Sequence, residues 1–242
     1  RPRPSRSDPP RVMSQHPPVT ALVSCDIIRP ELEALARRHA PRTRLAFCDQ
    51  DLHRRPEQMP AVIQQNVDEV AADDPVERVV LGYGLCSNGL VAVKAPAQGL
   101  IVPRVHDCVA LVLGSREAYD QQFNANPGTY YLTASWIDAD KDPLGTMEKE
   151  YTPRLGRETA EWGMREELRH HSRIALVDCG VCSGSCDRVR ARARQNAAFF
   201  EKHYEELQGS AQYLKRLITG PYPEDDFIQV APGDAVRQNM FF

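Results

Sequence analysis

Two short motifs carry side chains that can bind a metal ion or attack an electrophile. The first is the segment GYGLCSNG at residues 82–89, which contains Cys86, and the second is the triplet His106-Asp107-Cys108. Thiolate and imidazole are ligands that zinc prefers, and two such ligands two residues apart can bind the same ion where the chain is extended or turns. We therefore expect a metal site formed by Cys25, Cys86, His106 and Cys108, with zinc as the first choice and iron or an iron–sulfur cluster as the alternative.

The same motifs also fit an enzyme without a metal. In that interpretation Cys86 is the nucleophile, His106 is its general base and Asp107 completes the catalytic group. Glycines after a strand let the backbone approach a ligand closely, and free N–H groups there can hold a carboxylate or stabilise a thiolate. The segment lacks the Lys-Ser/Thr ending of a phosphate-binding loop and the glycine spacing of a dinucleotide site. The side chains expected to contact a small-molecule substrate are Arg104, Asn88 and Tyr130.

A second group of cysteines follows much later in the chain. Cys179, Cys182 and Cys186 have the spacing Cys-x-x-Cys-x-x-x-Cys, with glycine and serine between them. Such a loop can wrap a zinc ion or three corners of an iron–sulfur cluster. The alternative is a surface loop with incidental thiols. If Cys179 lies near Cys86, the two groups would build one larger site.

Short apolar segments alternate with amphipathic stretches along most of the chain. Strands are predicted at residues 20–24, 43–47, 77–81, 99–105, 129–136, 173–177 and 226–230. Helices are predicted at residues 31–39, 59–72, 109–123, 153–171 and 186–218, the last with a break near Gly209. This alternation is typical of a single α/β domain with one mostly parallel, doubly wound sheet and helices on both faces.

Cysteines gather where the predicted strands end. Those that follow a strand directly or closely are Cys25, Cys48, Cys86, Cys108 and Cys179. The carboxyl ends of parallel strands share one edge of a sheet, and ligands bind there, near the point where the strand order reverses. The sequence therefore places one shared site at the carboxyl edge of the sheet.

Composition excludes some classes of function. The formal net charge is -3, without the clustered basic surplus that nucleic-acid binding requires. No apolar run is long enough for a transmembrane helix, and an odd number of cysteines, 7, argues against a disulfide framework. We expect a cytoplasmic protein in which residues 1–18 are a disordered lead, residues 19–236 the α/β domain and residues 237–242 a tail.

Several ordered segments carry a family resemblance. The stretches at residues 81–90, 101–108, 113–116 and 127–133, the region of Cys25 and the closing APGD at residues 231–234 together resemble the domain-of-unknown-function family numbered 1638. The resemblance covers nearly the whole domain. It implies that Cys25, Cys86, His106, Asp107 and Cys108 form the site and that the Cys179 group is less typical. It also implies an association with corrinoid-dependent methyltransferases, beside which members of that family often occur in anaerobic and methylotrophic microbes.

These features together predict a metalloenzyme that acts on a small molecule, such as a metal-dependent transferase or lyase. The His-x-Cys element supplies zinc ligands in cobamide-dependent thiol methyltransferases, so thiol or methyl-group chemistry linked to corrinoid-dependent metabolism is the expected reaction class. A corrinoid protein or a methyltransferase is the expected partner. The alternatives are a non-catalytic carrier of a metal, a cluster or a corrinoid, and the metal-free enzyme that uses Cys86 and His106.

Overall fold

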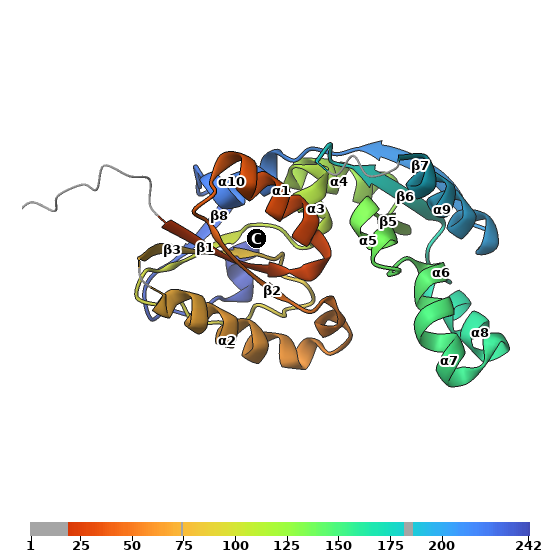
Figure 1. Cartoon of the computed structure of the whole chain (residues 1–242), viewed down its shortest axis with the longest axis horizontal. Coiled ribbons are helices and arrows are strands. Elements are labelled where there is room, and N and C mark those ends of the chain that lie inside the picture. Colours follow the sequence, from red (N-terminus) through yellow and green to blue (C-terminus); the bar gives the residue numbers. More distant parts are fainter. Residues whose placement is uncertain (1–18, 74, 182–185) are drawn as a thin grey trace, which may run out of the picture.

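The computed structural model describes residues 19–73, 75–181 and 186–242. The predictions for residues 1–18 and for Cys182 lie outside these ranges. Within them the chain folds into two lobes, each built on its own sheet (Figure 1). The α/β class with mostly parallel strands is confirmed, but the strands form two sheets rather than the single sheet that the alternation suggested.

The first lobe contains a five-stranded sheet in the order β2-β1-β3-β4-β8. Its parallel strands are β1 (Val19–Cys25), β2 (Arg44–Cys48), β3 (Val76–Gly82) and β4 (Leu100–Pro103), and β8 (Phe227–Val230) pairs antiparallel with β4. Helices α1 (Arg29–His39) and α10 (Gln212–Thr219) lie on one face of the sheet and α2 (Met59–Ala72) on the other (Figure 1). Every residue of β1 is buried, as expected for a central parallel strand covered on both faces.

The second lobe contains three parallel strands in the order β5-β6-β7. These are β5 (Thr129–Leu132), β6 (Arg173–Asp178) and β7 (His203–Gln208). Helices α5 (Ala134–Asp138) and α9 (Cys186–Phe199) pack on this sheet, and a helical projection follows α5 (Figure 1). The projection consists of α6 (Pro143–Thr146), the π-helical turn η4 (Met147–Tyr151), α7 (Thr152–Leu155) and α8 (Arg157–Glu167).

Two predicted helices are interrupted and one predicted strand is shortened, each at a residue that caps or breaks a helix. The predicted helix at 109–123 is two helices, α3 (Val109–Leu113) and α4 (Arg116–Ala125), because Gly114 adopts a positive φ of 98° and the Ser115 side chain caps α4. Gly156, with a φ of 78°, separates α7 from α8. Strand β5 stops at Leu132 because the Thr133 side chain accepts a hydrogen bond from the Trp136 N–H and begins α5.

The prediction of one long helical region at 186–218 is wrong. Strand β7 lies between α9 and α10, as an edge strand paired with β6. Its sequence HYEELQ lacks an apolar alternation because its side chains are exposed or half-buried, and Glu205 and Glu206 pair with arginines instead. Glu206, for example, accepts hydrogen bonds from Arg190 and Arg194 of α9.

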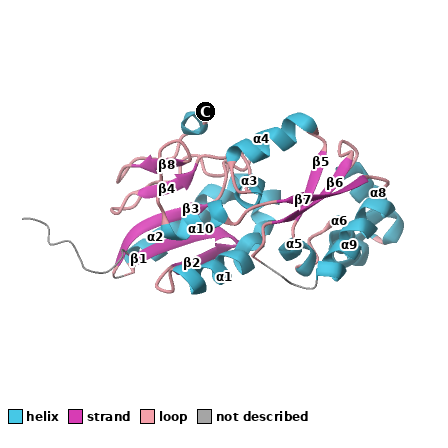
Figure 2. Ribbon diagram, turned by 90° about the horizontal axis from the view of Figure 1, so that it is seen from above, coloured by secondary structure: helices cyan, strands magenta, loops and turns pink. Residues whose placement is uncertain are grey.

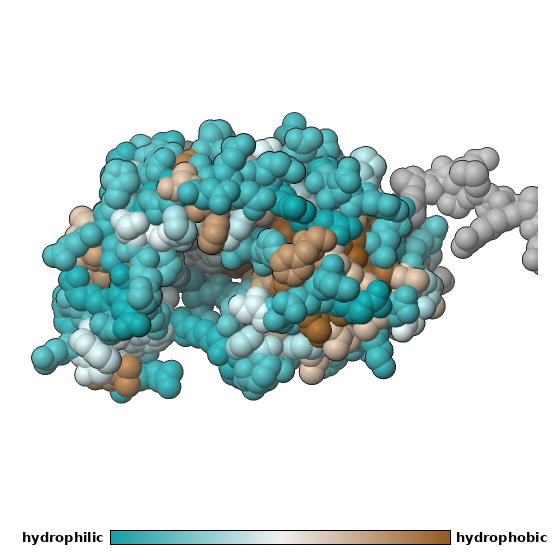
Figure 3. Space-filling view, turned by 180° about the vertical axis from the view of Figure 1, so that it is seen from behind, coloured by the Kyte–Doolittle hydropathy of each residue, from teal (hydrophilic) through white to brown (hydrophobic). Residues whose placement is uncertain are grey.

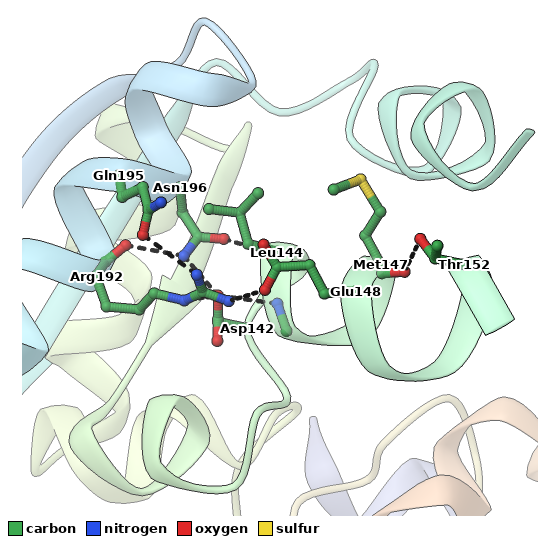
Figure 4. A network of polar contacts seen from close by, with 9 residues as sticks. Asp142, Leu144, Met147, Glu148, Thr152, Arg192, Gln195 and Asn196 are labelled. Atoms are coloured by element: carbon green, nitrogen blue, oxygen red, sulfur yellow. Dashed lines mark hydrogen bonds and ion pairs between the residues drawn. The ribbon is translucent and has the colours of Figure 1, made fainter. Parts of the chain in front are cut away.

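A buried polar network fixes the projection to α9. The Asp142 carboxylate, completely buried before α6, accepts hydrogen bonds from Arg192 Nε at 3.0 Å and Asn196 Nδ2 at 2.6 Å (Figure 4). Asn196 in turn accepts the Leu144 N–H at 2.9 Å through its Oδ1 atom. This network supplies partners for polar groups at the start of α6 that burial would otherwise leave unsatisfied.

The two lobes meet along α3, α4 and the first turn of α1 (Figure 2). A buried hydrogen bond of 2.5 Å joins Ser135 of α5 to Glu31 of α1. The short helices η1 (Asp26–Ile28), η2 (Gln50–Arg54) and η3 (Pro56–Gln58) follow β1 and β2, and η5 (Gln238–Phe241) closes the chain with Phe241 buried. No helix within the described ranges combines the length and the apolar character needed to cross a bilayer.

Candidate functional site

The thiols of the first lobe lie where its strand order reverses. The chain passes from β1 to β2 on one side of β1 and then returns to β3 on the other side, which opens a crevice at the carboxyl ends of β1 and β3. Cys25 is the last residue of β1, Cys86 follows β3, and Cys108 follows β4. The structure thus places the three cysteines on neighbouring strand ends.

Backbone pairing holds the two motif-bearing loops together. The Leu85 N–H donates to the Val105 carbonyl at 2.9 Å, and the Cys86 N–H donates to the His106 carbonyl at 3.0 Å. This pairing brings the Cys86 and Cys108 sulfurs to 3.3 Å from one another. The Gly84 N–H, 3.4 Å from the Cys108 sulfur, donates to it.

Cys86 begins a strained turn. Cys86, Ser87 and Asn88 have φ values of 45°, 56° and 68°, so three consecutive non-glycine residues are left-handed. The left-handed conformation costs roughly 1–2 kcal/mol for each such residue. Strain of this size persists only where surrounding structure enforces it, and it concentrates at functional sites. Here the turn points Cys86 and Ser87 into a cavity that both residues line.

Replacing Gly84 by alanine tests how closely the two loops must approach. An added Cβ would lie 2.8 Å from the backbone N and C atoms of Asp107, which is too close for any real Cβ atom. We expect Gly84→Ala to lower the free energy of unfolding by about 1–3 kcal/mol in chemical denaturation, because overpacking forces the loops apart. The matched control is Gly163→Ala in α8, where a Cβ meets nothing within 4 Å. There alanine is expected to stabilise the helix by about 0.5–1 kcal/mol, and an equal loss in both variants would contradict the steric explanation.

An imidazole that the sequence analysis did not single out stands beside Cys25. His53 lies in η2, and its Nε2 atom is 3.6 Å from the Cys25 sulfur. Burial lowers the pKa of His53, with Asp107 opposing the shift, so the neutral ring that a metal requires is favoured. The loop after β2 ends at the same edge as the cysteines. That placement is the signal by which His53 could have been found.

Tyr83 is the large buried side chain at the centre of this region. It is 1% exposed, and its ring lies 6.4 Å from that of His53. Burial, and then the neighbouring Cys25 and Cys48, raise the pKa of its phenol well above the ordinary value. Its hydroxyl is buried and shares a hydrogen bond with the Cys48 thiol at the end of β2. This contact joins the loop after β3 to the end of β2.

Two of the thiols are strongly held in the protonated form. Burial and then the neighbouring Cys108 raise the pKa of Cys25. The hydrogen bond with Cys86, followed by burial, raises the pKa of Cys108 well above its ordinary value. Neutral thiols are thus favoured in this crevice until a positive charge offsets the cost of ionising them.

The donors form two pairs, Cys25 with His53 and Cys86 with Cys108. In a tetrahedral zinc site the edges between ligand atoms are about 3.8 Å for two sulfurs and about 3.6 Å for sulfur and nitrogen. The Cys25–His53 distance of 3.6 Å matches the second of these edges, and the Cys86–Cys108 distance of 3.3 Å is somewhat short of the first. In the described ranges, however, no three His, Cys, Asp or Glu side chains stand together as one group suited to hold a metal ion.

The other predicted site residues are distributed around this crevice. The His106 ring packs against Phe242, with centroids 5.0 Å apart, and also borders the cavity. Asp107 lines the cavity and accepts the Val109 N–H at 2.7 Å, which caps α3. Arg104 instead binds the carbonyls of Glu224 and Met240, and so supports the C-terminal segment.

The second cysteine group is described in part. Cys179 is half-buried after β6, and burial raises its pKa to about 11, with Glu31 among the neighbouring charges. Cys182 and the side chain of Cys186 fall outside the described residues. The prediction that Cys179, Cys182 and Cys186 bind a metal or cluster therefore stays a prediction.

A cavity of about 620 Å³ extends from Cys86 to the second lobe. One wall consists of Cys86, His106 and Asp107, and the opposite wall includes Tyr130, Trp136 and His171. The molecule is visibly hollowed between its two lobes (Figure 3). This volume falls within the range of small-molecule sites, which are lined by aromatic surface with a few convergent polar groups. Of the predicted substrate contacts, Tyr130 lines this cavity.

Ion pairs bridge the lobes at the margin of the cavity. Lys141 of the second lobe binds Asp51 of η2 at 3.1 Å and Glu150 at 2.7 Å. Arg54, also of η2, binds the same Glu150 at 2.6 Å. Because η2 also carries His53, this bridge helps to fix the imidazole beside Cys25.

Comparison with known proteins identifies the family alone. No curated protein and no solved structure matched the chain. A family model, described as "Protein of unknown function (DUF1638)", matches residues 47–218. That range includes His53, Tyr83, Cys86, Cys108 and most of both lobes. The chain therefore belongs to the DUF1638 family.

Proposed function

We propose that this protein binds one soft metal ion, zinc foremost, through Cys25, His53, Cys86 and Cys108, beneath a cavity that holds a small-molecule substrate. The observation that carries the proposal is that the Cys25–His53 and Cys86–Cys108 pairs lie on neighbouring strand ends at the strand-order reversal.

Metal binding requires the two donor pairs to move together into one group. Each pair already has a separation close to a ligand–ligand edge, but the four donors do not yet form one group. Cys108 is among the groups that raise the pKa of Cys25, so the two pairs are near enough for their charges to interact. An ion would draw them together and remove the thiol protons, as metal binding to cysteine does generally.

The cavity bears on whether the ion would be structural or reactive, because it would give a small molecule access to the metal. Cys86 lines the cavity, so the metal would sit at its floor. A bound zinc ion supplies Lewis acidity and can hold a substrate thiol as its thiolate. For such a reaction one protein ligand must yield its place to substrate, while Asp107 and Tyr130 face the bound molecule from opposite walls. A transferase acting on a thiol or methyl group fits this arrangement, and its link to corrinoid metabolism stays a prediction.

Two other functions have less support. A carrier that stores or delivers a metal would keep all four protein ligands, and it would not need the cavity of about 620 Å³ above the site. A metal-free enzyme would pair the Cys86 thiol with the His106 ring. The Cys86 sulfur is instead in contact with Cys108, and the His106 ring packs on Phe242.

Elemental analysis tests the proposal. Protein purified without oxygen, supplied with zinc and then desalted should retain about one zinc ion per chain, and Cys108→Ser should retain almost none. The matched control is Cys48→Ser, which alters a buried thiol at the end of β2 that is not among the proposed ligands. Equal zinc content in the Cys108→Ser and Cys48→Ser proteins, or a wild-type chain without bound metal, would refute the proposed site.

A further inference from the structure

The Cys86–Cys108 pair has the geometry of a dithiol that can be oxidised within the chain. We propose that these two cysteines form a reversible disulfide, and that this bond switches the site off by removing two of its metal ligands. The first half of the inference stands on the geometry of the pair alone. The second half rests on the proposed metal site.

The two sulfurs need little movement to bond. They are 3.3 Å apart, and a disulfide requires about 2.05 Å, so they must approach by roughly 1.2 Å. Rotation of the two side chains can supply this, because the backbone is already paired at Leu85–Val105 and Cys86–His106. The new bond would join the loop after β3 to the loop after β4.

Other cysteines in the described ranges have different surroundings. Cys25 contacts the His53 ring, Cys48 is buried at the end of β2, and Cys179 packs against the main core after β6. Cys86 and Cys108 make the one sulfur–sulfur contact recorded among the described side chains. Among the cysteines whose side chains are described, oxidation should therefore favour this pair.

The different exposure of the two thiols sets the order in which they react. Cys86 is half-buried and lines the cavity, whereas Cys108 is buried, 8% exposed. The Cys86 thiolate attacks one sulfur of a small-molecule disulfide that enters the cavity, which releases one thiol and leaves a mixed disulfide. Cys108 then loses its proton and attacks the Cys86 sulfur, and the second small thiol leaves. Two protein thiols are oxidised and one small disulfide is reduced to two thiols, so protons and electrons balance.

The disulfide would change the metal site directly. A disulfide sulfur is no longer a thiolate, so oxidation would leave Cys25 and His53 as the remaining ligands. Loss of two of four ligands should weaken zinc binding at least roughly 1,000-fold. Reduction by an excess of dithiol would restore both thiolates and the affinity.

Peptide mapping tests the disulfide itself on metal-free, full-length protein. After treatment with oxidised glutathione and alkylation of free thiols, trypsin places Cys86 on residues 79–94 and Cys108 on residues 105–116, while Cys25 and Cys48 fall on other peptides. We expect the first two peptides to be linked in the wild type and in Cys48→Ser, and to separate after reduction. Free Cys86 and Cys108, glutathione that stays on Cys86, or a bond from either residue to another cysteine would overturn the inference.

Zinc titration of the reduced and oxidised proteins tests the switch. Tight binding to the reduced form and a loss of at least about 1,000-fold on oxidation are expected. Equal affinity of the two forms would overturn the switch and leave the zinc site standing. Conversely, a linked pair of peptides in a protein that binds zinc in neither form would refute the proposed function and leave the disulfide standing.

Discussion

Replacing His53 by alanine is expected to weaken zinc binding about 100-fold, because one of four ligands supplies roughly a quarter of the free energy of a site of this class. The Nε2 atom of His53 lies 3.6 Å from the Cys25 sulfur, which is the separation expected between two ligands of one zinc ion. The affinity is measured by competition with a chromophoric chelator under reducing conditions. A melting curve of the metal-free variant separates loss of the ligand from loss of the fold.

His106→Ala is the matched control for His53→Ala. Both rings border the cavity, but His106 packs on Phe242 and meets Cys86 through its backbone carbonyl. Alanine keeps that carbonyl, so we expect zinc affinity within about threefold of wild type, as for a substitution that removes no ligand. If His106→Ala loses the metal and His53→Ala keeps it, the ligand set expected from the sequence is right and the set taken from the structure is wrong.

The position of Cys25, Cys86 and Cys108 in the fold could be predicted from the sequence, whereas Cys179, expected at the same edge, follows β6 of the second sheet. Cys25 closes an apolar run, and Cys86 and Cys108 each follow one, so strand ends alone place them at one edge of a parallel sheet. The structure has β1, β3 and β4 side by side in that sheet. The placement of these three cysteines needs no side-chain geometry, because continuous apolar runs and the breaks after them are visible in the chain itself.

Which histidine ring lies beside one of these cysteines could not be predicted from strand ends. His106 is two residues from Cys108, which suggested a shared ion, yet its ring turns toward the C-terminal Phe242. His53 is far from Cys25 in sequence and reaches it because β2 lies beside β1 and η2 folds back over their ends. Such a contact depends on the order of the strands and on the path of the loops, and the local pattern of apolar residues predicts neither.

The second sheet could not be predicted for a related reason, since one of its strands lacks the apolar pattern of the others. Strand β7 is an exposed edge with the sequence HYEELQ, and its stabilisation comes from pairing with β6 and from ion pairs rather than from apolar alternation. Without β7, the strands β5 and β6 appear to continue the first sheet. The cavity between the lobes therefore became visible only in three dimensions, whereas Tyr130, which lines it, was already among the expected substrate contacts.

Replacing Asp142 by alanine is expected to lower the free energy of unfolding by about 3 kcal/mol. The carboxylate is fully buried and accepts hydrogen bonds from Arg192 and Asn196 (Figure 4). Its removal leaves a mostly buried guanidinium and a buried amide without their acceptor, and breaking a buried pair in this way costs about 3–5 kcal/mol. We take the lower end because the Arg192 side chain is 20% exposed and also binds Glu148. The melting temperature should fall by roughly 6–12 °C for a chain of this size.

Asp140→Asn is the matched control, since Asp140 is exposed and has a φ of 56°, which asparagine tolerates. Its stability should stay within about 0.5 kcal/mol of wild type. A double-mutant cycle with Arg192→Met then separates the pair from the surrounding packing. If Asp142 and Arg192 act together, the double variant loses less stability than the two single variants combined, by about 1–3 kcal/mol. Strictly additive losses would mean that Asp142 stabilises the projection through Asn196 and the α6 cap, without a contribution from the ion pair.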